Sequence, residues 1–237
     1  RNKTKIDALD VDEAHDRVIA GPAKRDRVIS KREREMVAYH EAGHTIVGMV
    51  LSDARIVHKV TIVPRGRAGG YAIMLPKEDR FLMTKDELLE QVVGLLGGRV
   101  AEEVVFNVQT TGASNDFEQA TGLIRSMVTE YGMSGEIGNI YLGGGQEVFL
   151  GRDYGHTKAY SESVSALVDS EVKKILDEAY NKAREIVINN KGKIEEIAAM
   201  LLEHEKIDGE EFVKIVGPRP FSALPVPEEA EKKEAKE

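Results

Sequence analysis

The chain has 237 residues, of which 41% are hydrophobic, so it is long and apolar enough to form one or two domains with buried cores. Its formal charge of -8, with basic residues scattered among acidic ones, excludes the basic face that nucleic-acid binding requires, and no nucleic-acid partner is expected. It contains no cysteine, which excludes disulfides, thiolate metal sites and cysteine nucleophiles. Any metal ion must therefore be bound by His, Asp or Glu side chains.

The N-terminus and the apolar runs of the sequence indicate a soluble piece of a longer protein. No apolar run approaches the ~20 residues that span a bilayer, and the start lacks the apolar centre of a signal peptide. The chain begins at Arg1 without a methionine, and the residues that follow already have a helical pattern. We therefore expect further segments of the protein to lie outside this chain.

The first two predicted elements are helices. Residues 7–20 form a short helix that ends at the stop signal Gly21-Pro22. Residues 31–51 form a second helix, because their apolar residues recur at helical spacing, and this helix contains the sequence "HEAGH". Gly43 within it costs roughly 1 kcal/mol relative to alanine. We therefore expect another backbone to pass close to Gly43.

Two strands and a third helix follow. The β-branched and aromatic runs at 58–66 and 69–76 are bounded by Gly and Pro, which is typical of two strands of a small sheet. A capping box formed by a threonine and a glutamate three residues later starts a helix over residues 84–106. The pair Gly97-Gly98 in this helix indicates close packing or a kink.

The second half of the chain is predicted to be mainly helical. After the turn-rich loop "TTGASND", Asn115 can cap a helix that runs to about Tyr131, which places Asp116 in its first turn. Further helices are expected at 161–190, 193–204 and 209–216. Residues 217–237, rich in Pro, Glu and Lys, are expected to be a disordered acidic tail. These elements predict a mainly α fold with a small β-sheet and a long C-terminal helical hairpin.

The sequence "HEAGH" places two histidines four residues apart, with a glutamate after the first. Residues four apart share one face of a helix, so His40 and His44 can bind one metal ion. Zinc at this position would lower the pKa of a bound water from about 15.7 to about 7 and polarise an amide carbonyl. Glu41 could take the proton of that water and deliver it to the leaving amine. We favour this interpretation over two ordinary core histidines, because the spacing has a mechanical reason.

A catalytic zinc site also needs a third protein ligand and an open fourth position. Val47 and Val50 stand where the metzincin pattern requires glycine and histidine, and no glutamate follows at the distance of a thermolysin-like ligand. Two acidic places remain, Glu102 with Glu103 in "GGRVAEE" and Asp116 in "TGASNDF". The residues alone leave these candidates open, because the helix dipole also favours an aspartate in a first turn.

Along the chain, "HEAGH", "LLGGRVAEE" and "TTGASNDFEQAT" are followed by "MVTEYGMS" and "FLGR". These motifs, in this order, resemble those of the FtsH family of membrane-anchored AAA zinc proteases. The resemblance covers residues 31–216 and implies a helical zincin-type peptidase domain there. Residues 1–22 resemble the end of the helical lid of the ATPase module, and residues 217–237 follow the peptidase domain as a tail.

The resemblance assigns roles to individual residues of this chain. It implies one Zn2+ per chain, bound by His40, His44 and Asp116, with Glu41 as the general base. Glu102 corresponds to a carboxylate behind the ligands that orients a histidine. The choice of Asp116 among the acidic candidates rests on this similarity and not on spacing.

The resemblance also implies partners and a location. FtsH proteases are homo-hexamers at the inner membrane, with the peptidase on the cytoplasmic side, and they use ATP to unfold and thread unfolded or membrane protein substrates. No glycine-rich loop of this chain ends in Gly-Lys-Ser/Thr, so ATP is expected in an ATPase module outside it, as is the membrane anchor. The alternative is a non-catalytic, zinc-stabilised module that holds a hexamer together. An extended peptide substrate could add to a strand edge at 58–66 or 69–76.

Overall fold

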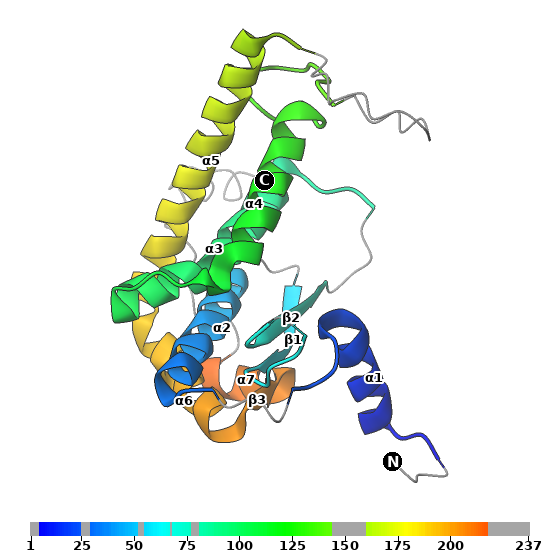
Figure 1. The fold of residues 1–237 in the computed structure, drawn as a ribbon, viewed down its shortest axis with the longest axis vertical. Coiled ribbons are helices and arrows are strands. Elements are labelled where there is room, and N and C mark those ends of the chain that lie inside the picture. The colour runs from blue at the N-terminus through cyan, green and yellow to red at the C-terminus, as the bar shows by residue number, and fades with distance from the viewer. Residues whose placement is uncertain are drawn as a thin grey trace, which may run out of the picture.

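The computed structural model describes residues 5–24, 29–51, 55–66, 68–76, 81–143 and 160–217. It is mainly helical, with one small sheet beside the helices (Figure 1), which confirms the predicted fold class. The elements are α1 (Ala8–Ala20), α2 (Lys31–Leu51), β1 (Arg55–Thr61), β2 (Tyr71–Pro76), α3 (Lys85–Phe106), the 3-10 helix η1 (Thr111–Ala113), α4 (Ser114–Thr129), α5 (Glu162–Asn189), α6 (Lys191–His204), β3 (Lys206–Asp208) and α7 (Gly209–Val216). None of the described helices has the length and apolar character that crossing a membrane requires. The predicted tail, apart from residue 217, lies outside the described residues.

Local capping determines where several helices begin. The Thr84 side chain accepts a hydrogen bond from the backbone N–H of Glu87, whose carboxylate bonds back to Thr84, so the predicted capping box is confirmed. The predicted cap at Asn115 is wrong, because Asn115 lies inside α4. The preceding 3-10 helix is capped instead by Thr110, and it leads directly into α4 with Asp116 in the first turn.

The sheet is antiparallel, with strand order β2-β1-β3. Val60 of the central strand β1 lies opposite Ala72 of β2 and opposite Ile207 of β3. The two predicted strands are therefore present, whereas β3, a three-residue strand between α6 and α7, was not predicted. Such a short segment carries no periodicity of its own, and its pairing with β1 is a long-range contact. Among the described strands, β1 is paired on both sides, so β2 and β3 are the edge strands of the sheet.

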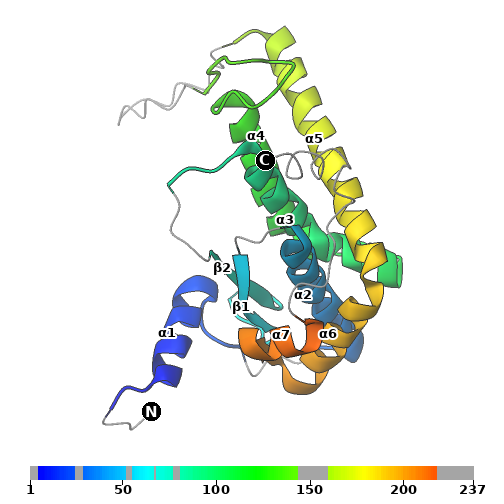
Figure 2. The ribbon, with the colours of Figure 1, turned by 180° about the vertical axis from the view of Figure 1, so that it is seen from behind.

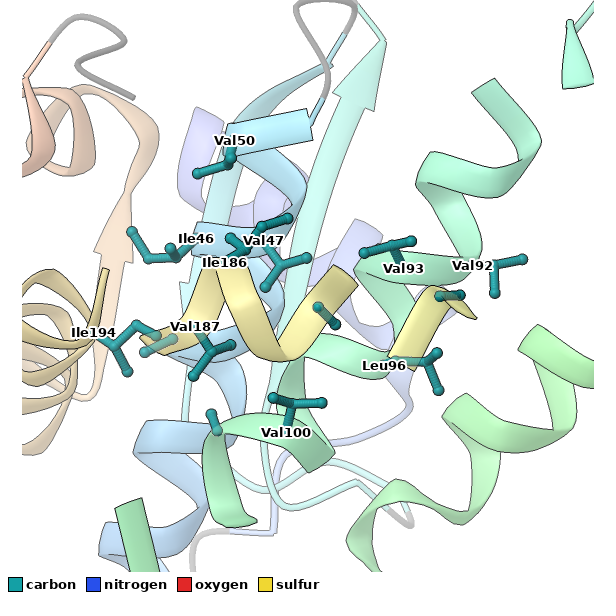
Figure 3. Packing of buried hydrophobic residues seen from close by; sticks show 14 of the residues in the cluster. Ile46, Val47, Val50, Val92, Val93, Leu96, Val100, Ile186, Val187 and Ile194 are labelled. Atoms are coloured by element: carbon teal, nitrogen blue, oxygen red, sulfur yellow. The ribbon is translucent and has the colours of Figure 1, made fainter. Parts of the chain in front are cut away.

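The core lies where α2, α3, α5 and α6 meet. Figure 3 shows side chains of these four helices pointing toward one another. They include Ile46 and Val47 of α2, Leu96 and Val100 of α3, Ile186 and Val187 of α5, and Ile194 of α6, all of which are buried. Packing of these apolar faces fixes α2, and with it the "HEAGH" sequence, against α3.

The helices α2 and α3 cross at two glycines. A Cβ atom on Gly43 would lie 2.5 Å from the carbonyl oxygen of Gly97, and a Cβ atom on Gly97 would lie 2.8 Å from the carbonyl oxygen of Gly43. No side chain fits between backbones at this separation. The close backbone approach expected at Gly43 is confirmed, and α3 is one continuous helix through Gly97.

Charged side chains join α1 to the sheet. In Figures 1 and 2 the sheet lies between α2 and α1. The Lys59 ammonium on β1 is 2.6 Å from a carboxylate oxygen of Asp12 and 3.1 Å from one of Asp16. Beside it, the Arg65 guanidinium is 2.7 Å from Glu13 and 3.3 Å from Asp16. Lys59 is only 3% exposed, so this is a partly buried ionic network and not a set of surface pairs.

Candidate metal centre

Two helices bring three potential metal ligands together. His40 and His44 project from the same face of α2, and Asp116 projects from the first turn of α4. The Nε2 atoms of the two histidines are 3.0 Å apart. The Oδ2 atom of Asp116 lies 3.3 Å from Nε2 of His40 and 3.5 Å from Nε2 of His44. Among the described residues, these three side chains form a group whose ligand atoms all lie within 4.8 Å of one another.

The other ring nitrogens are bound to acceptors on α3. Nδ1 of His40 is 2.7 Å from a carboxylate oxygen of Glu102, and Nδ1 of His44 is 3.0 Å from the carbonyl oxygen of Gly94. A carbonyl and a carboxylate accept hydrogen bonds, so each Nδ1 carries the hydrogen and donates it. In the neutral rings, the form that binds a metal, the lone pairs of both Nε2 atoms are thereby directed to the side where Asp116 lies.

A glycine on α3 keeps space beside the histidine rings. A Cβ atom on Gly98 would lie 2.5 Å from Nε2 of His44 and 2.6 Å from Nε2 of His40. Any other residue at this position would place its Cβ atom against both Nε2 atoms, which are the nitrogens available to a metal. Two imidazoles and a carboxylate are also ligands that zinc accepts. The absence of a side chain at Gly98, the convergence of the three ligand atoms and the donor set therefore fit a zinc ion.

The close charges shift the ionisation of the three groups in the metal-free chain. Burial lowers the pKa of His40, but its hydrogen bonds with Asp116 and Glu102 outweigh burial and raise this pKa to about 10. For the carboxyl of Asp116, burial acts in the opposite direction and raises the pKa. Its hydrogen bonds with His40 and His44 outweigh burial and hold this pKa well below its usual range. The site thus attracts positive charge, since Asp116 stays ionised and faces both rings.

Glu41 is buried next to this group, with 6% of its surface exposed. The backbone of Gly70, immediately before β2, packs on it, and a Cβ atom on Gly70 would lie 2.9 Å from a carboxylate oxygen of Glu41. Burial raises the pKa of this carboxyl, against the lowering effect of His40 and His44. A carboxylate with a raised pKa accepts a proton more readily, as a general base must.

The three acidic candidates have different environments. Asp116 faces the Nε2 atoms of both histidines, and Glu102 binds the far side of the His40 ring. Glu103 points away from the histidines toward α5, where its oxygens are 2.5 Å from the Tyr180 hydroxyl and 2.6 Å from the Arg184 guanidinium. The structure therefore distinguishes three acidic residues that sequence spacing alone could not distinguish as candidate metal ligands.

Two contributions to this site were missed in the sequence. The Gly94 carbonyl that holds His44 is a backbone atom, and no residue pattern marks such a contact. Thr110 donates hydrogen bonds to both carboxylate oxygens of Glu102, one from its backbone N–H and one from its hydroxyl. The hydroxyl residue at the start of "TTGASND" is a turn and capping signal, and it could have directed attention to this loop.

Comparison with known protein families gives a match over most of the chain. The sequence model described as peptidase family M41 matches residues 27–215. The chain is 55% identical over 218 residues to the ATP-dependent zinc metalloprotease FtsH of Bacillus subtilis (strain 168), with 91% of this chain and 34% of that relative covered. It is 60% identical over 208 residues to the protein of the same name from Streptococcus pneumoniae serotype 4, with coverages of 88% and 32%. The chain thus spans about a third of the length of these curated relatives.

Proposed function

Because this chain belongs to the FtsH proteins of peptidase family M41, we propose that it is the zinc-dependent peptidase part of an ATP-dependent endopeptidase. The observation that carries the proposal is the convergence of His40, His44 and Asp116 beside the buried carboxylate of Glu41. The names of the relatives, which are ATP-dependent zinc metalloproteases, agree with this chemistry.

The proposed ligands of the zinc ion are Nε2 of His40, Nε2 of His44 and the carboxylate of Asp116. Bound zinc supplies a water of lowered pKa and a Lewis acid for the carbonyl of the peptide bond. Three protein ligands leave a coordination position open, as catalytic zinc sites require. Glu102 holds the His40 ring from behind, and the Gly94 carbonyl does the same for His44.

Glu41 is proposed as the general base. Its buried carboxylate would take a proton from the attacking water and pass it to the nitrogen of the leaving amine. The carboxylate is buried, and it lies so near Gly70 that a side chain at Gly70 would collide with it. The burial that raises its pKa also makes it a better proton acceptor near neutral pH.

The edge strand β2 is proposed as the place where the substrate backbone binds. β2 begins one residue after Gly70, which contacts Glu41, so a peptide paired with this strand would pass close to the zinc ligands. Backbone pairing recognises an extended chain with little regard to its side chains. Unfolded protein segments are therefore the expected substrates.

The remaining parts of the full protein are proposed from the family. Residues 1–22 would be the end of the ATPase lid, residues 31–216 the peptidase domain, and residues 217–237 a tail. ATP would bind in the ATPase module and not in this chain. The family further suggests a homo-hexamer anchored at the inner membrane, with its peptidase sites on the cytoplasmic side, that degrades unfolded and membrane proteins.

The variant Glu41→Gln tests the reaction. The amide cannot accept the proton, so hydrolysis of unfolded casein should fall by at least about 100-fold. Metal analysis should still find one zinc per chain, since Glu41 is not a proposed ligand. Casein hydrolysis at the wild-type rate would contradict the role of Glu41. Zinc without any hydrolysis by the wild-type chain would favour the non-catalytic assembly module instead.

A further inference from the structure

Thr110 makes three hydrogen bonds to side chains of α3. Its backbone N–H donates to Oε2 of Glu102 at 3.1 Å, and its hydroxyl donates to Oε1 of the same carboxylate at 3.0 Å. Its carbonyl oxygen accepts a hydrogen bond from the guanidinium of Arg99. Main chain and side chain of Thr110 are thus both held against one turn of α3.

The contact between the Thr110 hydroxyl and Glu102 is connected to His40. Oε1 of Glu102, which accepts from the Thr110 hydroxyl, is also the oxygen that lies 2.7 Å from Nδ1 of His40. Glu102 is only 2% exposed, so protein groups and not bulk water determine how its carboxylate turns. Without the hydroxyl, Oε1 would keep His40 as its one hydrogen-bond partner among the described residues, and the carboxylate plane would be less constrained.

The Thr110 hydroxyl is also connected to the segment that carries Asp116. It accepts a hydrogen bond from the backbone N–H of Gly112 at 3.1 Å and so caps η1. That short helix runs without interruption into α4, whose first turn carries Asp116. A single oxygen atom therefore connects the carboxylate behind His40 with the start of the segment that carries the aspartate.

We propose that Thr110 is a positioning residue of the metal centre. Its hydroxyl orients Glu102, and through it His40, and it fixes the beginning of the segment that bears Asp116. The two halves of the site come from distant parts of the chain, and Thr110 sets their spacing. This inference rests on the proposed zinc site and adds to it a residue that does not touch the metal.

The test compares the zinc dissociation constants of Thr110→Val and Thr110→Ser, measured by competition with a chromogenic chelator. Residues that orient a ligand typically change metal affinity by about 10- to 100-fold when substituted. Valine keeps the shape but lacks the hydroxyl, so T110V should bind zinc at least about 10-fold more weakly. Serine keeps the hydroxyl, so T110S should stay within about 3-fold of wild type. Wild-type affinity in T110V would overturn the proposal.

Thr84→Val is the matched control. The Thr84 hydroxyl also accepts from a backbone N–H and donates to a glutamate, Glu87, which lies in the first turn of α3, 15 residues before Glu102. Both valine variants lose an N-cap and should lower the melting temperature of the metal-free chain. Only T110V should also weaken zinc binding. An equal loss of zinc affinity in T84V would mean that the loss in T110V comes from lower overall stability, and it would overturn the proposal.

Two further measurements test the proposal if T110V does not fold, and test whether its effect passes through Glu102. If T110V does not fold, T110A removes the hydroxyl without adding bulk and gives the same readout. In the background of Glu102→Ala, T110V should weaken zinc binding less than it does in wild type, because part of its effect passes through Glu102. Fully additive losses would overturn the route through Glu102.

The outcome also separates this inference from the proposed function. If wild-type protein binds no zinc, the proposed metal centre itself is wrong. If wild type binds one zinc and His44→Ala does not, the centre stands, and T110V then tests Thr110 alone. Zinc binding is the readout in every variant, so the result does not depend on peptidase activity.

Discussion

Gly98 shows how a single missing side chain can define a site. Its α-carbon faces both histidine rings, and a methyl group there would lie within 2.6 Å of both Nε2 atoms. In Gly98→Ala the gain in helix propensity, up to about 1 kcal/mol over glycine, should be outweighed by overpacking against the buried rings, which costs about 1 to 3 kcal/mol of unfolding free energy. Zinc binding should also be lost, because the methyl group would collide with both ligand nitrogens. Metal analysis and circular dichroism would test both parts.

Gly94 offers the control on the same helix. A Cβ atom on Gly94 would meet nothing within 4 Å. Gly94→Ala should therefore raise the free energy of unfolding by about 0.4 to 1 kcal/mol and keep zinc, because the carbonyl that holds His44 is retained. Full zinc content in G98A would show that the rings do not converge as the structure describes.

At the scale of elements, the crossing of α2 and α3 determines whether the histidines meet their partners on α3. Gly43→Ala should push the two helices apart, because the new methyl group would meet both the carbonyl of Gly97 and the side chain of Ala101. Overpacking of this kind costs about 1 to 3 kcal/mol of unfolding free energy. Urea unfolding would measure it.

The matched control for this prediction is Gly122→Ala on α4. A Cβ atom on Gly122 would also meet nothing within 4 Å, so alanine there should be neutral or stabilising by up to about 1 kcal/mol. Equal effects of G43A and G122A would mean that α2 and α3 are not in close contact.

The ionic network between α1 and the sheet gives a second prediction for elements. Asp16 contacts both Lys59 and Arg65, so Asp16→Ala leaves two cations with fewer partners. Hydrogen bonds to charged groups contribute about 1.5 to 3 kcal/mol each. Amide hydrogen exchange across Ala8–Ala20 should become faster in D16A and stay unchanged in α2.

The control for D16A is Asp177→Ala. Asp177 pairs with Lys173 four residues away on the exposed surface of α5, where such pairs contribute about 0.5 kcal/mol or less. D177A should leave hydrogen exchange of α1 unaffected. If D16A also leaves it unaffected, the network does not hold α1 on the sheet.

The same network predicts a dependence on pH. The hydrogen bond from Lys59 lowers the pKa of Asp12 below its ordinary value of 3.8, against the opposing effect of burial. A group with a lowered pKa stabilises the fold above its unfolded value and loses this contribution as the pH falls below it. Protection of α1 should therefore be constant down to about pH 4 and decrease below it.

Hydrogen exchange corrected for intrinsic rates would measure this acid step. Asp12→Asn should show a smaller decrease over the same interval, because its amide does not titrate. An identical decrease in wild type and D12N would assign the acid effect to other groups.

At the scale of the whole molecule, the proposed zinc ion joins α2 to α4 in addition to the apolar core. A ligand that binds only the folded state stabilises it by about 4 kcal/mol when present at about 1,000 times its dissociation constant. Removal of zinc with EDTA should therefore lower the melting temperature by several degrees. His44→Ala should melt at the same temperature with and without EDTA. An unchanged melting temperature of wild type in EDTA would argue against a bound metal.

Much of the helical architecture could be predicted because its signals are local. Capping residues and apolar spacing act within a few residues, and the predicted helix 31–51 has the bounds of α2 in the structure. The cap predicted at Asn115 failed because the chain makes a 3-10 turn first, with Thr110 as its cap. The strand β3 was missed because its three residues are extended only through pairing with β1.

The sequence by itself determined that two histidines and a glutamate share one helix, since residues four apart lie on the same face. The family resemblance of the motifs pointed to Asp116, but only the tertiary structure decided how each carboxylate lies relative to the Nε2 atoms, because Glu102, Glu103 and Asp116 all carry the same functional group. Helix packing places Glu102 behind the His40 ring, Glu103 against α5, and Asp116 opposite the Nε2 atoms of both rings. Those positions depend on contacts between segments far apart in the chain, and local sequence carries no physical signal of such contacts.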